Sequence, residues 1–508
     1  MHNFLYKRLY NIDWFKKKQN KKYLNHRSGI AGISCAIRLK NEGYNVKIYE
    51  KNKSFGGKID ELKMMGYRFD IGPSLLTMPD LIEEIFELTG KKIDNYLNFK
   101  KKKYICNYFY EDGTRFNAPA EKKEFAKRAS KTFNVSENEL LNYFELNKEK
   151  YDLTNGIFLR KSLHKISSYL SLETFKAILN IGKLGIFKNL SDFNDNTFSD
   201  KRLAQFYNRF ATYNGSSPYK TPAIMSMIPH LEQHYGVYFP IGGMRMISKK
   251  LFELAVEIGV EFNFNSEVKE IIIKNKKAIG LVVNQKQIIS DIVISNSDIE
   301  HTYGLMSKKI TASNVTKNEK SSSAIIFLWG VKKKFKELDL HNIFFSDDYK
   351  QEFDDIFQNK KISKDPTIYI NITSKENIED APVNCENWFT MINVPNNYGQ
   401  DWSDLIKSAK KNIIKKLNKN LKIDLENYID FEKVISPLDI EKKTNSSNGS
   451  LYGASSNDKF SALLRHSNFS NKIKNLFFCG GSVHPGGGIP LCLLSAKIVT
   501  DLIKEQKH

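Results

Sequence analysis

The run Gly29-Ile30-Ala31-Gly32 near the start of the chain constrains the fold most strongly. Apolar residues recur at helical spacing after it, and residues 45–50, NVKIYE, then alternate towards Glu50 as a strand does. Glycines at a helix start let the backbone approach a pyrophosphate, and an acidic residue about 20 positions later accepts hydrogen bonds from a ribose. Glu50 follows Gly32 by 18 residues. This spacing predicts the helix and second strand of a dinucleotide-binding unit.

The residues before Gly29 do not match the first strand of such a unit. A buried apolar strand and one more glycine are expected there, but the chain has Tyr23, Asn25, His26 and Arg27. As written, Arg27 replaces a glycine in a tight turn. The polar Asn25 and His26 would lie in a strand buried on both faces, which costs several kcal/mol.

A shift of the reading frame would remove this mismatch. Residues 22–29 can be encoded AAA TAT CTT AAT CAT CGG AGC GGG, and the same bases shifted by one read Asn-Ile-Leu-Ile-Ile-Gly-Ala-Gly. That is the missing strand with its glycine. Our hypothesis is that one base was lost close to Gly29, which makes residues 1–28 an atypical, out-of-frame N-terminus. Resequencing the gene tests it, because an intact frame with other codons contradicts the shift.

Glycine-rich segments also occur further along the chain. Gly56-Gly57-Lys58 and Asp70-Ile71-Gly72 follow Glu50 closely. Residues 480–497, GGSVHPGGGIPLCLLSAK, include a glycine loop that joins a predicted buried strand at 475–481 to a predicted helix at 491–503. So many glycines in one loop favour close approach of the backbone to a ligand over packing.

The predicted elements divide the chain into two interleaved units. A helix is predicted at 242–259, and the run 321–331 is predicted as a central strand. Four further β-type runs are predicted at 260–265, 268–274, 278–283 and 291–296. We expect residues 29–100, 236–300 and 474–508 to form the nucleotide-binding domain. Residues 101–235 and 301–473 are expected to form a substrate domain that associates with a membrane.

Composition narrows the classes of function. The net charge of +21 suits nucleic acid or an anionic membrane, but the lysines are scattered and no nucleic-acid motif accompanies them, so we expect no nucleic-acid partner. The five cysteines are far apart and no His cluster joins them, which argues against a metal site and favours the cytoplasm. No apolar run approaches the ~20 residues that span a bilayer. Residues 175–190 predict a helix that lies in a membrane interface or faces an ordinary core.

These motifs together resemble a known family. The segments 207–223, 230–244, 291–298 and 480–497 resemble carotenoid desaturases and isomerases of the phytoene-desaturase type, within the FAD-dependent amine-oxidase-like superfamily. Residues 211–219 and 480–497 are most similar to hydroxycarotenoid 3,4-desaturases, with phytoene desaturase as the close alternative. The resemblance implies an α/β fold, in which a Rossmann-like FAD-binding domain is combined with an interleaved α+β substrate domain.

The resemblance also implies positions for the cofactor and the substrate. The residues that it assigns to FAD are Gly29, Gly32, Glu50, Gly57, Lys58, Gly72, Val268, Gly480, Gly481, Gly488, Ile489 and Pro490. Candidates for the substrate pocket are Arg209, Tyr213 and His484, each of which has an alternative structural role as a salt-bridged arginine, a core tyrosine or a loop-capping histidine.

The implied reaction removes a hydride and a proton from adjacent carbons of a lipophilic carotenoid, with FAD as the hydride acceptor. Because loss of hydride leaves a delocalised cation with an acidic neighbouring proton, a weak base suffices, and we assign no catalytic residue. Oxygen or a quinone would reoxidise the flavin, at a membrane surface. Two other interpretations are open: an amine or protoporphyrinogen oxidase of the same superfamily, and a remnant that no longer binds flavin because its first strand is damaged.

Overall fold

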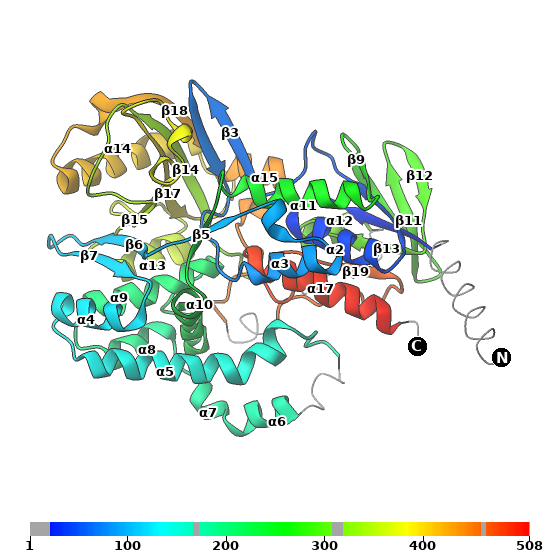
Figure 1. Cartoon of the computed structure of the whole chain (residues 1–508), viewed down its shortest axis with the longest axis horizontal. Coiled ribbons are helices and arrows are strands. Elements are labelled where there is room, and N and C mark those ends of the chain that lie inside the picture. The colour runs from blue at the N-terminus through cyan, green and yellow to red at the C-terminus, as the bar shows by residue number, and fades with distance from the viewer. Residues whose placement is uncertain (1–20, 166–171, 307–317, 459–463, 507–508) are drawn as a thin grey trace.

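The structure is a computed structural model that describes residues 21–165, 172–306, 318–458 and 464–506. Figure 1 shows a nucleotide-type half built around one parallel sheet, beside a half in which a larger sheet lies over a layer of helices. Segments from the start, middle and end of the chain meet in the first half.

A five-stranded parallel sheet in the order β19-β13-β1-β2-β9 forms the centre of the first half. Its strands are β1 (Lys22–His26), β2 (Asn45–Tyr49), β9 (Glu261–Asn263), β13 (Ile292–Ser295) and β19 (Leu476–Phe478). The predicted helix after Gly29 and the strand before Glu50 are confirmed as α2 (Ile30–Asn41) and β2. The sequence as written also forms β1, the central strand, with Asn25 opposite Ile48 and Ile294.

The two faces of this sheet are covered differently. One face packs on helices, whose apolar sides share a core with alternate strand residues such as Tyr23. These helices are α2, α3 (Asp80–Leu88), α11 (Arg245–Glu257) and α17 (Ile489–Glu505). The other face, which includes Leu24, packs on a small antiparallel sheet and a short helix. They are β10 (Val268–Lys274), β11 (Lys277–Val283), β12 (Lys286–Ile289) and α12 (Ile299–Gly304). β1 is therefore buried on both faces.

The second half contains a seven-stranded mixed sheet in the order β18-β14-β17-β16-β15-β6-β7. The strands are β6 (Tyr104–Phe109), β7 (Arg115–Pro119), β14 (Ser323–Val331), β15 (His341–Phe344), β16 (Ile368–Ile372), β17 (Glu386–Val394) and β18 (Ile429–Ile435). The prediction of a central strand at 321–331 is confirmed, because β14 pairs on both sides and all its residues are buried. One face of the sheet packs on α14 (Trp402–Leu421). Two further antiparallel pairs join the halves: the hairpin of β3 (Asp60–Met64) with β4 (Tyr67–Ile71), and the long-range pair of β5 (Phe99–Lys101) with β8 (Tyr238–Pro240).

A helical layer lies beside this sheet (Figure 1). Its core is rich in packed aromatic rings. Its helices are α4 (Lys122–Phe133), α5 (Glu137–Thr154), α6 (Leu172–Leu179), α7 (Ile181–Leu184), α8 (Leu190–Thr197), α9 (Lys201–Asn208), α10 (Met227–Tyr235) and α13 (Tyr349–Asp354); α15 (Pro437–Thr444) follows β18. The single helix predicted over 175–190 is wrong. It is divided into α6 and α7, and Gly185 with φ of +70° ends the second, a conformation in which glycine terminates helices.

Among the helices of the described segments, none combines the length and the apolar character that crossing a membrane requires.

Candidate active site

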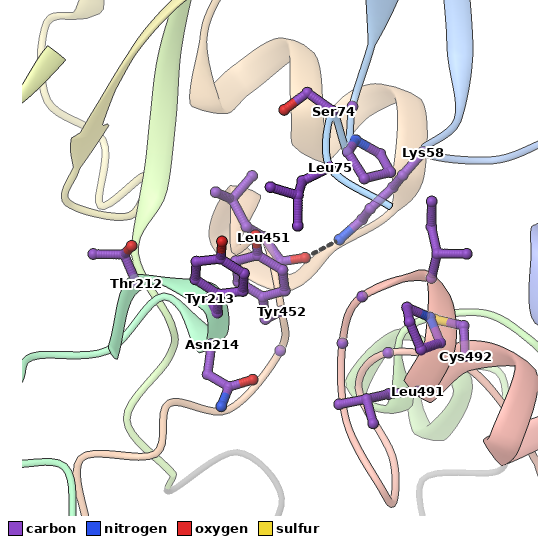
Figure 2. Close-up of a pocket in the computed structure, with 18 of the residues that line it drawn as sticks. Lys58, Ser74, Leu75, Thr212, Tyr213, Asn214, Leu451, Tyr452, Leu491 and Cys492 are labelled. Atoms are coloured by element: carbon purple, nitrogen blue, oxygen red, sulfur yellow. Dashed lines mark hydrogen bonds between the residues drawn. The ribbon is translucent and has the colours of Figure 1, made fainter. Parts of the chain in front are cut away.

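A cavity of about 500 Å³ lies where the glycine-rich loops, the seven-stranded sheet and the helical layer meet. Figure 2 shows its walls, with Tyr213 and Asn214 on one side, Leu491 and Cys492 on the other, and Lys58 between them. Much of the wall away from the glycine loops is apolar. Its apolar side chains include Ile105, Leu159, Ile224, Met227, Leu231, Ile326, Phe389 and Met391.

Two glycine turns form one edge of the cavity. Gly29 is the N-cap of α2, and the following residues Ile30 and Ala31 also line the cavity. A Cβ built on Gly57 would lie 3.1 Å from the Cα of Gly29, and the Gly56 amide donates to the Ser28 carbonyl at 2.8 Å. The positive end of a twelve-residue helix therefore meets two closely packed glycine turns at the cavity edge, which suits an anionic pyrophosphate.

Ten of the twelve residues predicted to bind FAD line this cavity, and two do not. Those that line it are Gly29, Glu50, Gly57, Lys58, Gly72, Gly480, Gly481, Gly488, Ile489 and Pro490. Val268 instead begins β10 and packs in the core beneath β1. Gly32 lies behind the turn, where a Cβ would come 2.5 Å from the Arg27 carbonyl oxygen.

Asn296, which the sequence reasoning missed, holds three of these segments together. Its Oδ1 accepts from the Gly32 amide at 3.1 Å, and its Nδ2 donates to the Cys479 carbonyl at 3.0 Å. A Cβ on Gly29 or Gly480 would come within 2.7 Å of its amide group. Asn296 is the last residue of the predicted strand 291–296. The carboxyl ends of parallel strands are where nucleotides bind, so this position could have identified it.

Glu50 accepts hydrogen bonds from the turn after β1 and from its own loop. The Ser28 amide and hydroxyl both donate to Oε2, at 2.8 and 2.9 Å, and the Asn52 amide donates to Oε1 at 3.0 Å. The carboxylate is buried yet lines the cavity. These three donors fix the orientation of the carboxylate, and its binding to a ribose stays a prediction.

Arg27 departs from this arrangement. Its φ is +87°, a left-handed conformation that favours glycine, and its side chain is buried and lines the cavity. Nη1 lies 3.8 Å from Oε1 of Glu50, while Nε and Nη2 have no hydrogen-bond partner within the described part of the chain. Burial lowers the pKa of Arg27 against the opposing charge of Glu50. The guanidinium therefore stands beside the carboxylate that is predicted to bind the ribose.

The neighbouring residues of β1 are also polar side chains in a buried strand where apolar residues are expected. Asn25 donates to the Gly32 carbonyl at 2.8 Å, but its Oδ1 finds no partner among the described residues. Burial and the charge of Arg27 hold the pKa of His26 well below its usual range. Every position that the shifted frame would change to an apolar or small residue, 23 and 25–28, is buried. The frame-shift hypothesis remains a prediction. The buried environment at each of these positions suits the apolar or small residue that the shifted frame would supply.

Lys58 reaches across the cavity (Figure 2). Its Nζ donates to the Leu451 carbonyl at 2.6 Å, and its side chain keeps accessible surface that faces the cavity. Surrounding protein lowers the pKa of this amine, and the charge of Asp298 opposes that effect. A lysine held by carbonyl oxygens alone can exchange them for an anionic ligand.

The C-terminal loop lines the opposite edge of the cavity. A Cβ on Gly481 would lie 3.2 Å from the Cα of Gly487, so the loop folds tightly on itself before α17 begins at Ile489. His484 in this loop is buried, and its Nε2 donates to the Lys161 carbonyl at 3.0 Å. Burial lowers the pKa of His484 to about 4, so the ring is neutral. His484 lines the cavity as well as bracing the loop, and both predicted roles stay open.

Arg209 and Tyr213 come together with Glu232 from α10, which the sequence reasoning missed. Arg209 Nη2 lies 3.5 Å from Oε2 of Glu232, and the Tyr213 hydroxyl donates to Oε1 of the same carboxylate. The Arg209 guanidinium also lies over the Phe210 ring, 4.2 Å from its centroid. Burial raises the pKa of Glu232 to about 7 against the charge of Arg209. All three ionisable side chains line the cavity.

A second group of polar side chains, connected in series by hydrogen bonds, also lines the cavity. His341 Nδ1 lies 2.8 Å from the Tyr369 hydroxyl, which lies 2.7 Å from the Ser74 hydroxyl. Burial lowers the pKa of His341 to about 3, and the charge of Arg209 adds to this effect. No spacing in the sequence brings these residues together, because they come from β15, β16 and the loop after β4.

Comparison with known proteins identifies the family. The model of the family described as flavin containing amine oxidoreductase matches residues 30–504. The chain belongs to this family. It is an FAD-dependent oxidoreductase, which agrees with the glycine-lined crevice at the N-terminus of α2. Apart from Arg27, the residues of that crevice fit a dinucleotide.

Some relatives are similar to this chain along nearly the whole length of both proteins. The chain is 54% identical over 478 residues, 94% of its length and 97% of the relative, to a 1-hydroxycarotenoid 3,4-desaturase of Flavobacterium sp. (strain P99-3). It is 31% identical over 490 residues to a 4,4'-diapolycopene oxygenase of Methylomonas sp., covering 94% and 96% of the two chains. The predicted similarity to carotenoid-modifying flavoproteins is thereby confirmed.

Solved structures show the same fold at low identity. An oxidoreductase from Methanosarcina mazei has a TM-score of 0.64 at 15% identity, covering 94% of this chain and 100% of that one. Putrescine oxidase bound to putrescine has a TM-score of 0.62 at 13% identity, covering 96% and 99%. The predicted α/β fold class is confirmed.

Proposed function

We propose that this protein desaturates the 3,4 bond of a hydroxylated acyclic carotenoid during carotenoid biosynthesis. The observation that carries the proposal is an apolar cavity continuous with the glycine crevice, in a chain 54% identical to a 1-hydroxycarotenoid 3,4-desaturase. A long hydrocarbon gains free energy from burial against such walls, whereas a cationic amine would lose hydration without a matching anion along most of them.

The residues proposed to hold FAD surround the crevice. The α2 N-terminus and Lys58 would hold the pyrophosphate, and Glu50 the ribose. Bound there, FAD supplies a hydride acceptor for the reaction. The cavity-lining start of α17, at Ile489 and Pro490, would direct its positive end at the flavin ring and favour its negatively charged reduced form.

The protein's further contribution is to orient the chain and exclude water. Apolar side chains from β14, β17 and α10 would keep the reacting carbons dry, so that the cationic charge which develops is not captured by water. The proton lost from the adjacent carbon is acidic enough for a weak base, and we assign none. Oxygen or a quinone as the final electron acceptor stays a prediction.

Product analysis tests the proposal. The purified protein, given a 1-hydroxylated acyclic carotenoid, should form a product with one more double bond at the 3,4 position, detected by mass and by a red shift of the visible absorption. Conversion of phytoene instead would favour the alternative, a phytoene desaturase. Loss of activity towards every carotenoid would contradict both.

Arg27 supports a second candidate, a remnant that binds flavin poorly. A buried guanidinium without full pairing lies in the crevice, at a position that favours glycine. Purified protein without the absorbance of an oxidised flavin near ~450 nm would favour this candidate. Protein that carries flavin in a ratio close to one per chain would contradict it.

Association with a membrane surface, through α6 and α7, is part of the proposal. Phe175, Leu179 and Phe187 are exposed, the last two by 68% and 71%. Lys176 and Lys188 are exposed beside them, as an anionic interface requires. On their inner side Ala177 and Leu184 pack with Phe158, Ile224 and Met225, which line the cavity. A lipid-soluble substrate would thus enter next to the membrane.

Vesicle binding tests this surface. The wild-type protein should sediment with vesicles that contain anionic lipid, and serine at positions 175, 179 and 187 should abolish the binding. Val383→Ser is a matched control, since Val383 is 87% exposed in the loop before β17. Equal binding by the triple variant and the control would contradict the assignment of α6 and α7.

A further inference from the structure

Six polar residues interrupt the apolar wall of the cavity and form one patch. Arg209, Tyr213 and Glu232 come from the helical layer. Ser74, His341 and Tyr369 come from the loop after β4 and from the seven-stranded sheet. Both groups line the same cavity. Burial raises the pKa of Tyr369, and the charges of Arg209 and Glu232 also act on it. We call these six residues the polar patch.

The sheet side of the polar patch offers a hydrogen-bond donor. The Asn371 side-chain amide lies 3.2 Å from His341 Nδ1, and an amide NH₂ group can only donate, so Nδ1 accepts. The buried ring is neutral and therefore carries its proton on Nε2. That N–H has no partner in the described residues.

The helical side offers both a donor and an acceptor. Arg209 Nε also has no hydrogen-bond partner in the described ranges. The Glu232 carboxylate is contacted on one oxygen by Tyr213 and on the other by Arg209 at 3.5 Å, a long contact for a hydrogen bond. Oε2 of Glu232 therefore retains most of its capacity to accept.

We propose that the polar patch binds the hydroxyl group of the substrate, an inference that rests on the proposed function. A hydroxyl is the small group that both donates, here to Glu232, and accepts, here from His341 Nε2–H or Arg209. A carboxylate ligand has no proton to donate to Glu232. A pure hydrocarbon end would leave these buried groups without partners, which disfavours its binding.

The position of the polar patch agrees with oxidation of the neighbouring bond. In a 1-hydroxycarotenoid only one carbon separates the hydroxyl-bearing carbon from the 3,4 bond, so a hydroxyl subsite has to adjoin the flavin. Ser74, which joins the patch through Tyr369, follows Gly72 by two residues in the loop predicted to hold FAD. An anchored hydroxyl at this point would select which bond of a repetitive polyene reaches the flavin.

Paired ligands and matched variants test the proposal. The flavin-loaded protein is titrated with a 1-hydroxylated acyclic carotenoid and with its non-hydroxylated parent, and binding is followed by the change in the flavin absorption. We expect the wild type to prefer the hydroxylated ligand roughly 10- to 100-fold, the ratio that loss of one charge-assisted hydrogen bond produces. Glu232→Gln and His341→Phe should each reduce this preference about tenfold or more, with little change for the parent.

Tyr108→Phe provides the control. It also removes a buried hydroxyl from a ring near Arg209, but that hydroxyl has no partner in the described residues, and Tyr108 does not line the cavity. It should retain the wild-type preference. If the wild type desaturates carotenoids but binds both ligands equally, or if Glu232→Gln and His341→Phe keep the full preference, the subsite is wrong while the proposed function stands. If no carotenoid binds at all, the proposed function fails as well.

Discussion

Two buried arginine–glutamate pairs line the same cavity, and their surroundings differ. Arg209 pairs with Glu232 at 3.5 Å from an ordinary helical backbone, with φ of −59°, and lies over aromatic rings. Arg27 pairs with Glu50 at 3.8 Å from a left-handed backbone, beside a carboxylate that Ser28 and Asn52 already occupy.

This difference shows that pairing alone does not make a buried charge favourable. The cost of desolvation is offset only when geometry and further contacts are good. In the Arg209–Glu232 pair, the guanidinium lies over an aromatic ring and the carboxylate accepts from the Tyr213 hydroxyl. The Arg27 pair has backbone strain and two nitrogens without partners in the described chain. We therefore expect removal of Arg209 to destabilise the protein and removal of Arg27 to stabilise it.

The largest expected effect is that of Arg209→Met. It leaves Glu232 buried without its counter-charge, which should lower the free energy of unfolding by about 3–5 kcal/mol. Urea unfolding followed by tryptophan fluorescence measures it. The double variant Arg209→Met/Glu232→Leu should recover most of the loss, because no unpaired charge remains. A double variant as unstable as the single one would mean that packing of Arg209, not its charge, matters.

Arg27→Gly is expected to act in the opposite direction. Glycine relieves a left-handed conformation that costs other residues about 1–2 kcal/mol, and it empties the crevice beside Glu50. The thermal midpoint and the flavin content per chain should both rise. Arg27→Ala is the matched control: it removes the guanidinium but keeps the strained Cβ, so it should gain flavin without the full gain in stability. Equal thermal midpoints for Arg27→Gly and Arg27→Ala would contradict backbone strain at residue 27.

A further expected effect is a pH dependence at Glu232. Its pKa rises from 4.5 to about 7 on folding, because burial outweighs the charge of Arg209. Between these values the folded protein binds a proton that the unfolded chain has released, so stability should fall as pH rises, by at most about 1.4 kcal/mol per pH unit. Glu232→Gln should remove this slope. The other ionisable groups that interact electrostatically with Glu232 are Cys106, Tyr108 and Tyr369. An unchanged slope in the variant would assign the titration to another group.

The glycine pattern predicted the nucleotide-type half well, and for a local reason. Gly29, Gly57 and the 480–488 loop are constrained by backbone conformation and close approach, which short stretches of sequence record directly. Gly32 and Val268 are different. Both were carried over from the family resemblance, yet one supports the turn from behind and the other packs beneath β1.

The polar patch could not be predicted in the same way. Glu232 lies in the family-like segment 230–244, but no fixed spacing in the sequence links it to His341 or Tyr369. The helix predicted at 175–190 failed for a related reason: apolar periodicity continued through Asn180 and Gly185, but the backbone breaks there.

By itself, the sequence determined the parallel α/β unit, the glycine-lined crevice and the membership of a flavoprotein family, because these depend on periodicity and on residues that are near neighbours in the chain. Only the tertiary structure decided that residues 22–26 form the central strand despite their polar side chains, and that Arg27 takes the conformation of a glycine. It alone assembled the polar patch, because burial, charge and hydrogen bonding between distant segments exist only once the two halves enclose the cavity.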